Sequence, residues 1–439
     1  MDGLALLGIV AFVLGLMLSI ALHEIGHLVP AKAFGVKVTQ YMVGFGSTLW
    51  STRRGETEYG IKVIPFGGYV RMIGMFPPEP GGDPTRLRQA STGPFQALVE
   101  DARRLAKEEI GPGEQDRVFY RKPWWQKLII MLGGPAMNVL IAVVLAGAVL
   151  TTYGNPADPT LTPTVSAVSE CVVPVSEAPR DCTAEDSATP AAAAGFRAGD
   201  EIVGFDGRAV QSWDEISTGI REHGEGPADV TVVRDGQEVV LTPDLVVTER
   251  PADPLDPQNG RLAEVGFLGV SPTPVVEPQP PAAVAAWIGD FTWRTGQAVL
   301  AIPAKMVGVW QAAFGGAERD PMGPVGIVGA GRIGGEIASA DTVPVVDRVA
   351  FFFLLLASFN MAIALFNLIP LLPLDGGHAA GAIWEGLKRG YARIAHRPEP
   401  RPVDVARALP LAYGIAAVLI SMSVLLLYAD IVNPIRLAG

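Results

Sequence analysis

His23, Glu24 and His27 form the pattern H-E-x-x-H at the end of the long apolar run of residues 4–24. Side chains four residues apart share one face of a helix, so His23 and His27 can bind one metal ion. Glu24 beside them can act as a general base, the arrangement of a zinc hydrolase. The pattern also recurs by chance as an ordinary polar patch. Because ionisable groups near a membrane span are costly and usually functional, the apolar setting favours a zinc site.

A catalytic zinc ion needs a third protein ligand and an open position for water. The stretch NLIPLLPLDGGH (367–378) closes the third apolar run and contains Asp375, the carboxylate nearest to that end. If the first and third runs cross in the same direction, Asp375 lies at the depth of His27, and we expect it to be the third ligand. His378 is the rival ligand, and the structural alternative for Asp375 is a turn residue in Asp-Gly-Gly.

Two further stretches could meet a substrate. Asn367 precedes Pro370 and Pro373, where a helix is expected to break and expose its backbone, so we expect Asn367 to contact the substrate. Asn360, inside the run, is expected to be structural. Residues 35–75 are rich in β-branched and aromatic residues with glycine at turns, which predicts strands and hairpins. Their edges can pair with an unwound peptide by strand addition, and the segment includes Gly44, Phe45 and Gly46.

Four apolar runs are long enough to be membrane spans. A crossing needs about 20 apolar residues. Charged residues make up only 18% of the chain, against about 25% in soluble domains. No basic residue precedes the first run, so we interpret it as a span and not as a signal peptide. The four runs cover residues 4–24, 128–152, 349–372 and 408–428.

Charge predicts the orientation of these spans. Residues 32–127 contain 15 Lys and Arg, whereas residues 154–285 contain 22 Asp and Glu against 7 Arg. Basic loops stay in the cytoplasm. We therefore expect residues 32–127 and 376–407 on the cytoplasmic side, and residues 154–345 and both termini outside. The net charge of −11 arises from the outer segment and does not indicate nucleic acid binding.

Residues 162–247 read as a compact module of short strands with two helical pieces. Cys171 and Cys182 lie in the same outer segment, where an oxidising environment permits a disulfide; two unpaired thiols are the alternative. Residues 250–284 read as Pro-rich and irregular, and residues 286–314 as amphipathic surface helices. The Gly-rich stretch 323–335 is expected to be a close-packing turn.

These motifs together resemble the site-2 protease family of intramembrane zinc metalloproteases, in particular the bacterial group with a single outward PDZ domain, the actinobacterial type. The resemblance rests on HEIGH, GFG (44–46), IPFGGYV (64–70), GGPAMN (133–138) and NLIPLLPLDGGH, in this order. It implies that His23, His27 and Asp375 bind one zinc ion and that Glu24 is the base.

The resemblance also implies the substrates. It points to cleavage of single-span membrane proteins within or near their spans, typically anti-sigma factors already trimmed outside, by an enzyme of the bacterial inner membrane whose active site lies near the cytoplasmic face. The PDZ domain would act as a size filter or hold a newly exposed C-terminus. The alternatives from other classes are a non-enzymatic PDZ scaffold and a metal transporter.

The expected fold class is a polytopic α-helical membrane protein with four transmembrane helices, a membrane-associated β-rich loop and an extracytoplasmic PDZ-like α+β domain. The expected segments are transmembrane helix 1 with the zinc motif (1–34), a β-hairpin region (35–76), a cytoplasmic insert with a helix around 95–109 (77–127), transmembrane helix 2 (128–153), the PDZ domain (162–247), a Pro-rich linker with surface helices (248–345), transmembrane helix 3 with the LDG motif (346–378) and transmembrane helix 4 (408–430).

Overall fold

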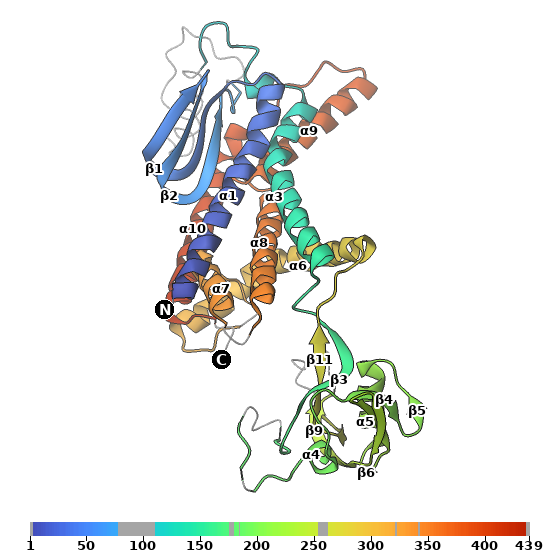
Figure 1. Ribbon diagram of the computed structural model, residues 1–439. Helices are drawn as coiled ribbons and strands as arrows, with labels where there is room; N and C mark the ends of the chain where they lie inside the picture. Colours follow the sequence, from blue (N-terminus) through green and yellow to red (C-terminus); the bar gives the residue numbers. More distant parts are fainter. Residues whose placement is uncertain are drawn as a thin grey trace. The chain divides into compact units, whose positions relative to one another are not determined.

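The computed structural model of the chain describes residues 3–77, 110–174, 180–183, 185–252, 262–320, 323–340 and 343–435. The helix expected around 95–109 lies outside the described residues. The chain divides into two compact units, one formed by Met1–Thr152 with Gln279–Gly439 and the other by Tyr153–Pro278. Each unit has its own hydrophobic core, and the two are described separately (Figure 1).

Among the described residues, the first unit contains four helices that are long and apolar enough to cross a membrane, in agreement with the number of spans expected from the sequence. Leucines on α1 and α10, among them Leu7, Leu18 and Leu411, are exposed. Large apolar side chains on an outer surface are stable where lipid replaces water. The four helices are α1 (Gly3–Ala33), α3 (Trp124–Thr152), α8 (Val345–Asn367) and α10 (Leu409–Val432), the last preceded by the short helix η4 (Val405–Ala408).

Glycines let α1 and α3 approach until their backbones touch. A methyl group on Gly26 would overlap the carbonyl of Gly133, and one on Gly133 would overlap the carbonyl of Gly26. Small residues at a helix crossing allow this contact in membranes, where no hydrophobic force pulls helices together. The packing role expected for the GGPAMN stretch agrees with this geometry, and the close approach brings His27 against α3.

The Gly-rich stretch expected to be a turn is largely a helix. Residues Ile327–Ser339 form α7, which packs against α1. A methyl group on Gly8 of α1 would overlap the backbone of Gly334, and one on Gly335 would approach Ile9. The expected close packing is present. The expected turn was wrong, because the stretch forms a helix in which Gly334 and Gly335 contact α1.

The third span is shorter than expected, and an unexpected helix comes after it. α8 ends at Asn367, and Asp375 is the first residue of α9 (Asp375–Ile394). The expected helix of 346–378 was therefore wrong in its extent. Pro370 and Pro373 lie in the connecting segment, where proline cannot continue helical hydrogen bonding. The LDG motif thus opens a new helix.

A sheet of two long, bent strands lies beside α1. β1 (Val38–Arg54) and β2 (Thr57–Met72) pair so that residues 40–43 lie between residues 58–61 and residues 68–71. Burial raises the pKa of Tyr41 to about 12, so its hydroxyl stays protonated, and it donates a hydrogen bond of 2.8 Å to the carbonyl of Ala21. This bond attaches the sheet to α1 close to the zinc motif.

A long helix and a short one also belong to the first unit. Pro281–Phe314 forms the single helix α6, which packs against α10, α8 and α3. The short helix η1 (Phe119–Arg121) leads into α3.

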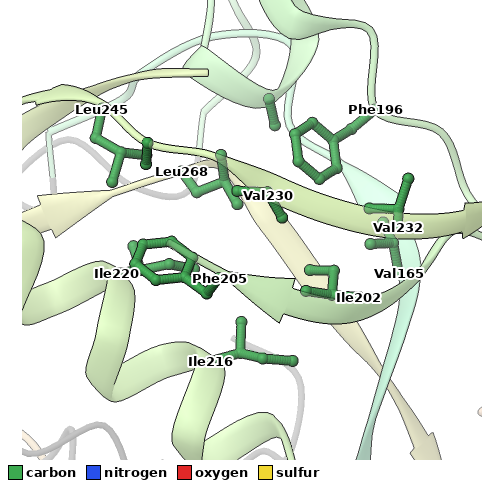
Figure 2. Packing of buried hydrophobic residues seen from close by; sticks show 12 residues of the cluster. Val165, Phe196, Ile202, Phe205, Ile216, Ile220, Val230, Val232, Leu245 and Leu268 are labelled. Carbon is green, nitrogen blue, oxygen red and sulfur yellow. The ribbon is translucent and has the colours of Figure 1, made fainter. Parts of the chain in front are cut away.

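The second unit is an α+β module built around one core. Figure 2 shows Phe205, Ile216 and Ile220 packed against buried residues of the strands, among them Val230. Its main sheet has the order β11-β3-β4-β7-β8 with β5 beside β4, and a second sheet has the order β10-β9-β6. The elements are β3 (Thr160–Val168), α4 (Pro190–Ala194), β4 (Glu201–Phe205), β5 (Arg208–Ala209), α5 (Trp213–His223), β6 (Gly226–Pro227), β7 (Val230–Arg234), β8 (Gln237–Leu241), β9 (Asp244–Pro251), β10 (Leu262–Phe267) and β11 (Val270–Val275).

This module is larger than the expected range of 162–247. The stretch 250–284, expected to be an irregular linker, contains β10 and β11, which pair with β9 and β3. Leu268 between them is buried in the core, so burial stabilises strands in a stretch whose many prolines suggested irregular structure. Cys171 and Cys182 form a disulfide. Arg234 holds the pKa of the buried Asp200 carboxyl below its usual range through hydrogen bonds of 2.7 Å.

Candidate metal centre

His23, Glu24 and His27 lie on one continuous helix, and all three side chains are buried. The Nε2 atoms of the two histidines are 3.3 Å apart. His27 Nδ1 lies 2.7 Å from the carbonyl oxygen of Ile130 on α3. A carbonyl can only accept, so Nδ1 carries the proton and the lone pair is left on Nε2. The contact between α1 and α3 therefore orients His27 so that its free nitrogen faces His23, as a metal ligand would require.

Asp375 completes a group of three candidate ligand atoms, although it lies 348 positions after His27 in the chain. Its Oδ2 atom lies 3.3 Å from His23 Nε2 and 3.4 Å from His27 Nε2. The start of α9 thus reaches the zinc motif of α1. His378, the rival ligand considered from the sequence, is not a member of this group.

The triangle of ligand atoms has the size that a tetrahedral zinc ion requires. Zinc bonds to nitrogen and oxygen of about 2.0–2.1 Å, at tetrahedral angles, imply ligand atoms about 3.3–3.4 Å apart. The three separations here are 3.3, 3.3 and 3.4 Å. The donor set of two imidazoles and one carboxylate is also typical of catalytic zinc, with the fourth position left for water or substrate. The residues present therefore fit the metal.

The metal centre is also lined by two glycines, Gly134 and Gly68, which the sequence analysis did not identify. A methyl group on Gly134 of α3 would lie less than 3.0 Å from Nε2 of both His23 and His27. A methyl group on Gly68 of β2 would lie 2.8 Å from the Cγ atom of Glu24. The first glycine leaves room at the ligand atoms, and the second lets the sheet touch the glutamate. Their only signal in the sequence was membership of the GGPAMN and IPFGGYV stretches.

The residues expected to meet substrate lie outside the ligand group. Gly44 and Gly46 have φ values of +91° and +85°, which glycine adopts readily, and Phe45 between them is 47% exposed. The Phe45 ring stacks on that of Tyr69. Asn367 is the last residue of α8 and is half-buried.

Asn360 ties two spans together. Its side-chain amide donates a hydrogen bond of 3.0 Å to the hydroxyl of Ser19 on α1. Both side chains are buried, so this bond links the helix that carries His23 to the helix that leads to Asp375.

Four apolar helices, two buried histidines and the half-buried Asp375 beside a buried glutamate are the arrangement expected of a membrane metallopeptidase. A family model described as peptidase family M50 matches residues 11–396. The chain is 38% identical to zinc metalloprotease Rip1 of Mycobacterium tuberculosis, and the alignment covers 98% of each chain. It is 35% identical to Rip1 of Mycolicibacterium smegmatis, again over 98% of each chain, and 27% identical to metalloprotease MmpA of Caulobacter vibrioides, over 90% of this chain and 88% of MmpA.

The chain belongs to peptidase family M50, the site-2 protease family. The resemblance drawn from the sequence is thereby confirmed, and the protein is a zinc metalloprotease of the membrane. The readings as a non-enzymatic scaffold and as a metal transporter do not agree with this membership.

Proposed function

We propose that this chain cleaves single-span membrane proteins within or near their transmembrane segments, with one zinc ion held by His23, His27 and Asp375. The observation that carries the proposal is the triangle of ligand atoms, whose sides match those of one tetrahedral zinc ion. Glu24 is the proposed general base. Its buried position next to His23 on α1 supports this role.

When bound, zinc supplies Lewis-acid activation of the scissile carbonyl and of the attacking water. The Glu24 carboxylate removes a proton from that water and later delivers it to the leaving amine. His27 is kept in one tautomer by the carbonyl of Ile130, so its ligand nitrogen does not have to reorganise during the reaction. The packed helices α1 and α3 exclude bulk water from one side of the ligand group, which strengthens the electrostatic interactions within it.

The substrate is proposed to bind as an extended strand next to β1 and β2. A helical substrate has its backbone carbonyls engaged, so it must unwind before it can be cut. The sheet touches Glu24 through Gly68, and therefore a peptide added to the sheet passes close to the base. The exposed Phe45 ring, between Gly44 and Gly46, offers an apolar contact for it. Asn367 is proposed to hydrogen-bond the substrate backbone where α8 ends.

We further propose that Tyr153–Pro278 is a PDZ domain outside the bacterial inner membrane, on the same side as both termini, with the active site near the cytoplasmic face. Two features support that orientation: this segment is acidic, and residues 32–127 are rich in Lys and Arg, which favour the cytoplasmic side. The natural substrates proposed are anti-sigma factors already trimmed on the outside.

The groove of this domain favours a size filter over capture of a C-terminus. A groove of about 680 Å³ lies along α5 and β5. Its lining includes four carboxylates against Arg208 and His223, and His223 already lies 2.8 Å from Asp206. A free C-terminal carboxylate would meet like charges there, which is unfavourable. The four carboxylates are Asp206, Asp214, Glu215 and Glu222.

The test is co-expression with a tagged anti-sigma factor that lacks its outer domain. Glu24→Gln is expected to abolish cleavage and to leave one zinc ion per purified chain. His23→Ala and Asp375→Ala are expected to lose both cleavage and zinc. Glu318→Gln, an exposed glutamate of the same unit, is the matched control and should behave as the wild type. Unchanged cleavage in Glu24→Gln would refute the assigned base, and full zinc content in Asp375→Ala would refute the assigned ligand.

A further inference from the structure

α9 has an exposed apolar face that neither the metal centre nor the helix packing explains. The helix packs against α3 with small residues such as Ala379 and Ala382. On its other side, Trp384, Leu387 and Ile394 are 58%, 61% and 80% exposed. The apolar stripe follows helical spacing over three turns and consists of Ile383, Trp384, Leu387, Tyr391 and Ile394.

This face lies at the level where a membrane span ends. Figure 1 shows α9 alongside one end of α3, and α3 begins at Trp124 as a helix of spanning length. The Trp124 ring packs on Gly386 of α9, since a methyl group there would overlap the ring. Trp125 next to it is 44% exposed. Paired tryptophans at the end of a span are typical of the boundary between lipid and water, so α9 runs along that boundary.

Positive charge surrounds the stripe. Residues 383–401 contain five Lys and Arg against two Glu. Glu385 is buried and already pairs with Lys127 at 2.8 Å and with Arg389 at 3.0 Å, and Glu399 pairs with Arg389 at 3.3 Å. Both acids are thus occupied by these partners.

Arg393 and Arg397 are the arginines placed to bind a ligand in a groove beside the stripe. Among the described residues, no carboxylate forms an ion pair with Arg393 or Arg397, and Arg397 lies 5.7 Å from the centre of the Tyr391 ring. Both arginines line a groove of about 620 Å³, together with Trp124, Gly386, Gly390 and the paired residues Arg389 and Glu399. The groove combines guanidinium groups, which bind phosphate with matched geometry, with indole rings that suit the lipid boundary.

We propose that α9 is an interfacial helix and that this groove binds the headgroup of an anionic phospholipid. The stripe from Ile383 to Ile394 inserts among the acyl chains, and Arg393 and Arg397 bind the phosphodiester. Basic amphipathic helices at membrane surfaces bind in this way. Because α9 starts at Asp375, the lipid holds in place the helix that supplies one carboxylate of the metal centre. The inference depends on the membrane placement of the chain and not on its peptidase activity.

The first experiment titrates the purified full-length protein in a zwitterionic detergent with short-chain phosphatidylglycerol, with phosphatidylcholine, or with inorganic phosphate, and measures thermal stabilisation. Phosphatidylglycerol is expected to stabilise the wild type at lower concentration than phosphatidylcholine, and phosphate alone should have no effect. Each arginine near an anionic surface contributes about fivefold in affinity, so Arg393→Gln with Arg397→Gln should weaken phosphatidylglycerol binding by about 25-fold. Binding of phosphatidylcholine should not change.

The matched control is Arg53→Gln with Arg54→Gln, two adjacent exposed arginines of β1 that do not line the groove. It should keep the wild-type preference for phosphatidylglycerol. Three results would overturn the proposal: equal stabilisation by both lipids, equal stabilisation by phosphate alone, or an unchanged lipid preference in the Arg393 and Arg397 variant. If neither lipid is preferred, and the Arg393 and Arg397 variant differs from the wild type in oligomeric state, the face binds a second copy of the chain instead.

A second experiment tests the apolar stripe separately from the charges. In vesicles with brominated acyl chains, tryptophan fluorescence of the wild type should be quenched more than that of Trp384→Phe, because Trp384 lies among the acyl chains. Trp293→Phe, which removes an exposed tryptophan of α6, measures the effect of losing any one tryptophan. Equal quenching in the wild type and in Trp384→Phe would show that the stripe does not enter the bilayer.

Discussion

Gly134 provides a sharp test of the metal centre, because the expected effect of alanine there is opposite to its usual effect in a helix. Within a helix, alanine is normally more favourable than glycine by about 0.5–1 kcal/mol. At Gly134, however, the new methyl group would lie less than 3.0 Å from Nε2 of His23 and of His27. At least one imidazole must move, and the ligand triangle with its sides of 3.3–3.4 Å is then lost.

The expected size of the effect follows from how closely metal sites depend on ligand orientation. Changes in groups that position metal ligands lower affinity by about 10–100-fold, and we expect Gly134→Ala to lower zinc affinity at least that much. The assay is the zinc content of the purified full chain after dialysis against chelators of increasing strength, with peptide cleavage as the second readout.

Gly147→Ala is the matched control on the same helix. Apart from its chain neighbours and the backbone of its own helix, no atom lies within 4 Å of its added methyl group, so this variant should retain zinc and cleavage. Gly133→Ala should behave differently from both, because its methyl group meets the backbone of Gly26 and not a side chain. Overpacking of this kind typically costs about 1–3 kcal/mol of stability. If Gly134→Ala binds zinc as the wild type does, the assignment of this space to the metal centre is refuted.

Three further predictions address other parts of the molecule. Arg234 lowers the pKa of Asp200, so this pair stabilises the second unit above the pKa of an unfolded aspartate, about 3.9, and the stabilisation disappears as pH falls below that value. As pH is lowered below about 4, the melting temperature of the full chain should therefore fall less in Asp200→Asn than in the wild type. An identical dependence of the melting temperature on pH would contradict this. Phe45→Ala should raise the KM for a membrane substrate with zinc content unchanged; an unaltered KM would remove Phe45 from the binding surface. Asn360→Ala should lower the melting temperature, since it breaks the buried bond to Ser19, a loss of about 1 kcal/mol. Wild-type stability would show that this bond does not hold the spans together.

The local part of the metal centre was predictable, and the connection around it was not. His23 and His27 share a helix face because of their spacing alone, and Asp375 was expected from the direction of the spans. The end of α8 at Asn367 and the new helix that starts at Asp375 were missed, because two prolines predict that a helix breaks but do not predict the backbone conformation beyond the break. β10 and β11 were missed because the prolines of residues 250–284 suggested irregular structure, whereas pairing with β9 and β3 and burial of Leu268 stabilise both strands.

The sequence by itself determined the types and helical spacing of the candidate ligands, the four apolar runs and the family. These features are local, because a side chain's chemistry and a helix period need no partner. Only the tertiary structure decided the distances among His23, His27 and Asp375, the tautomer imposed by Ile130 and the space kept open by Gly134. These depend on how closely α1, α3 and α9 approach one another, and that distance is set by contacts between residues that are remote in the chain.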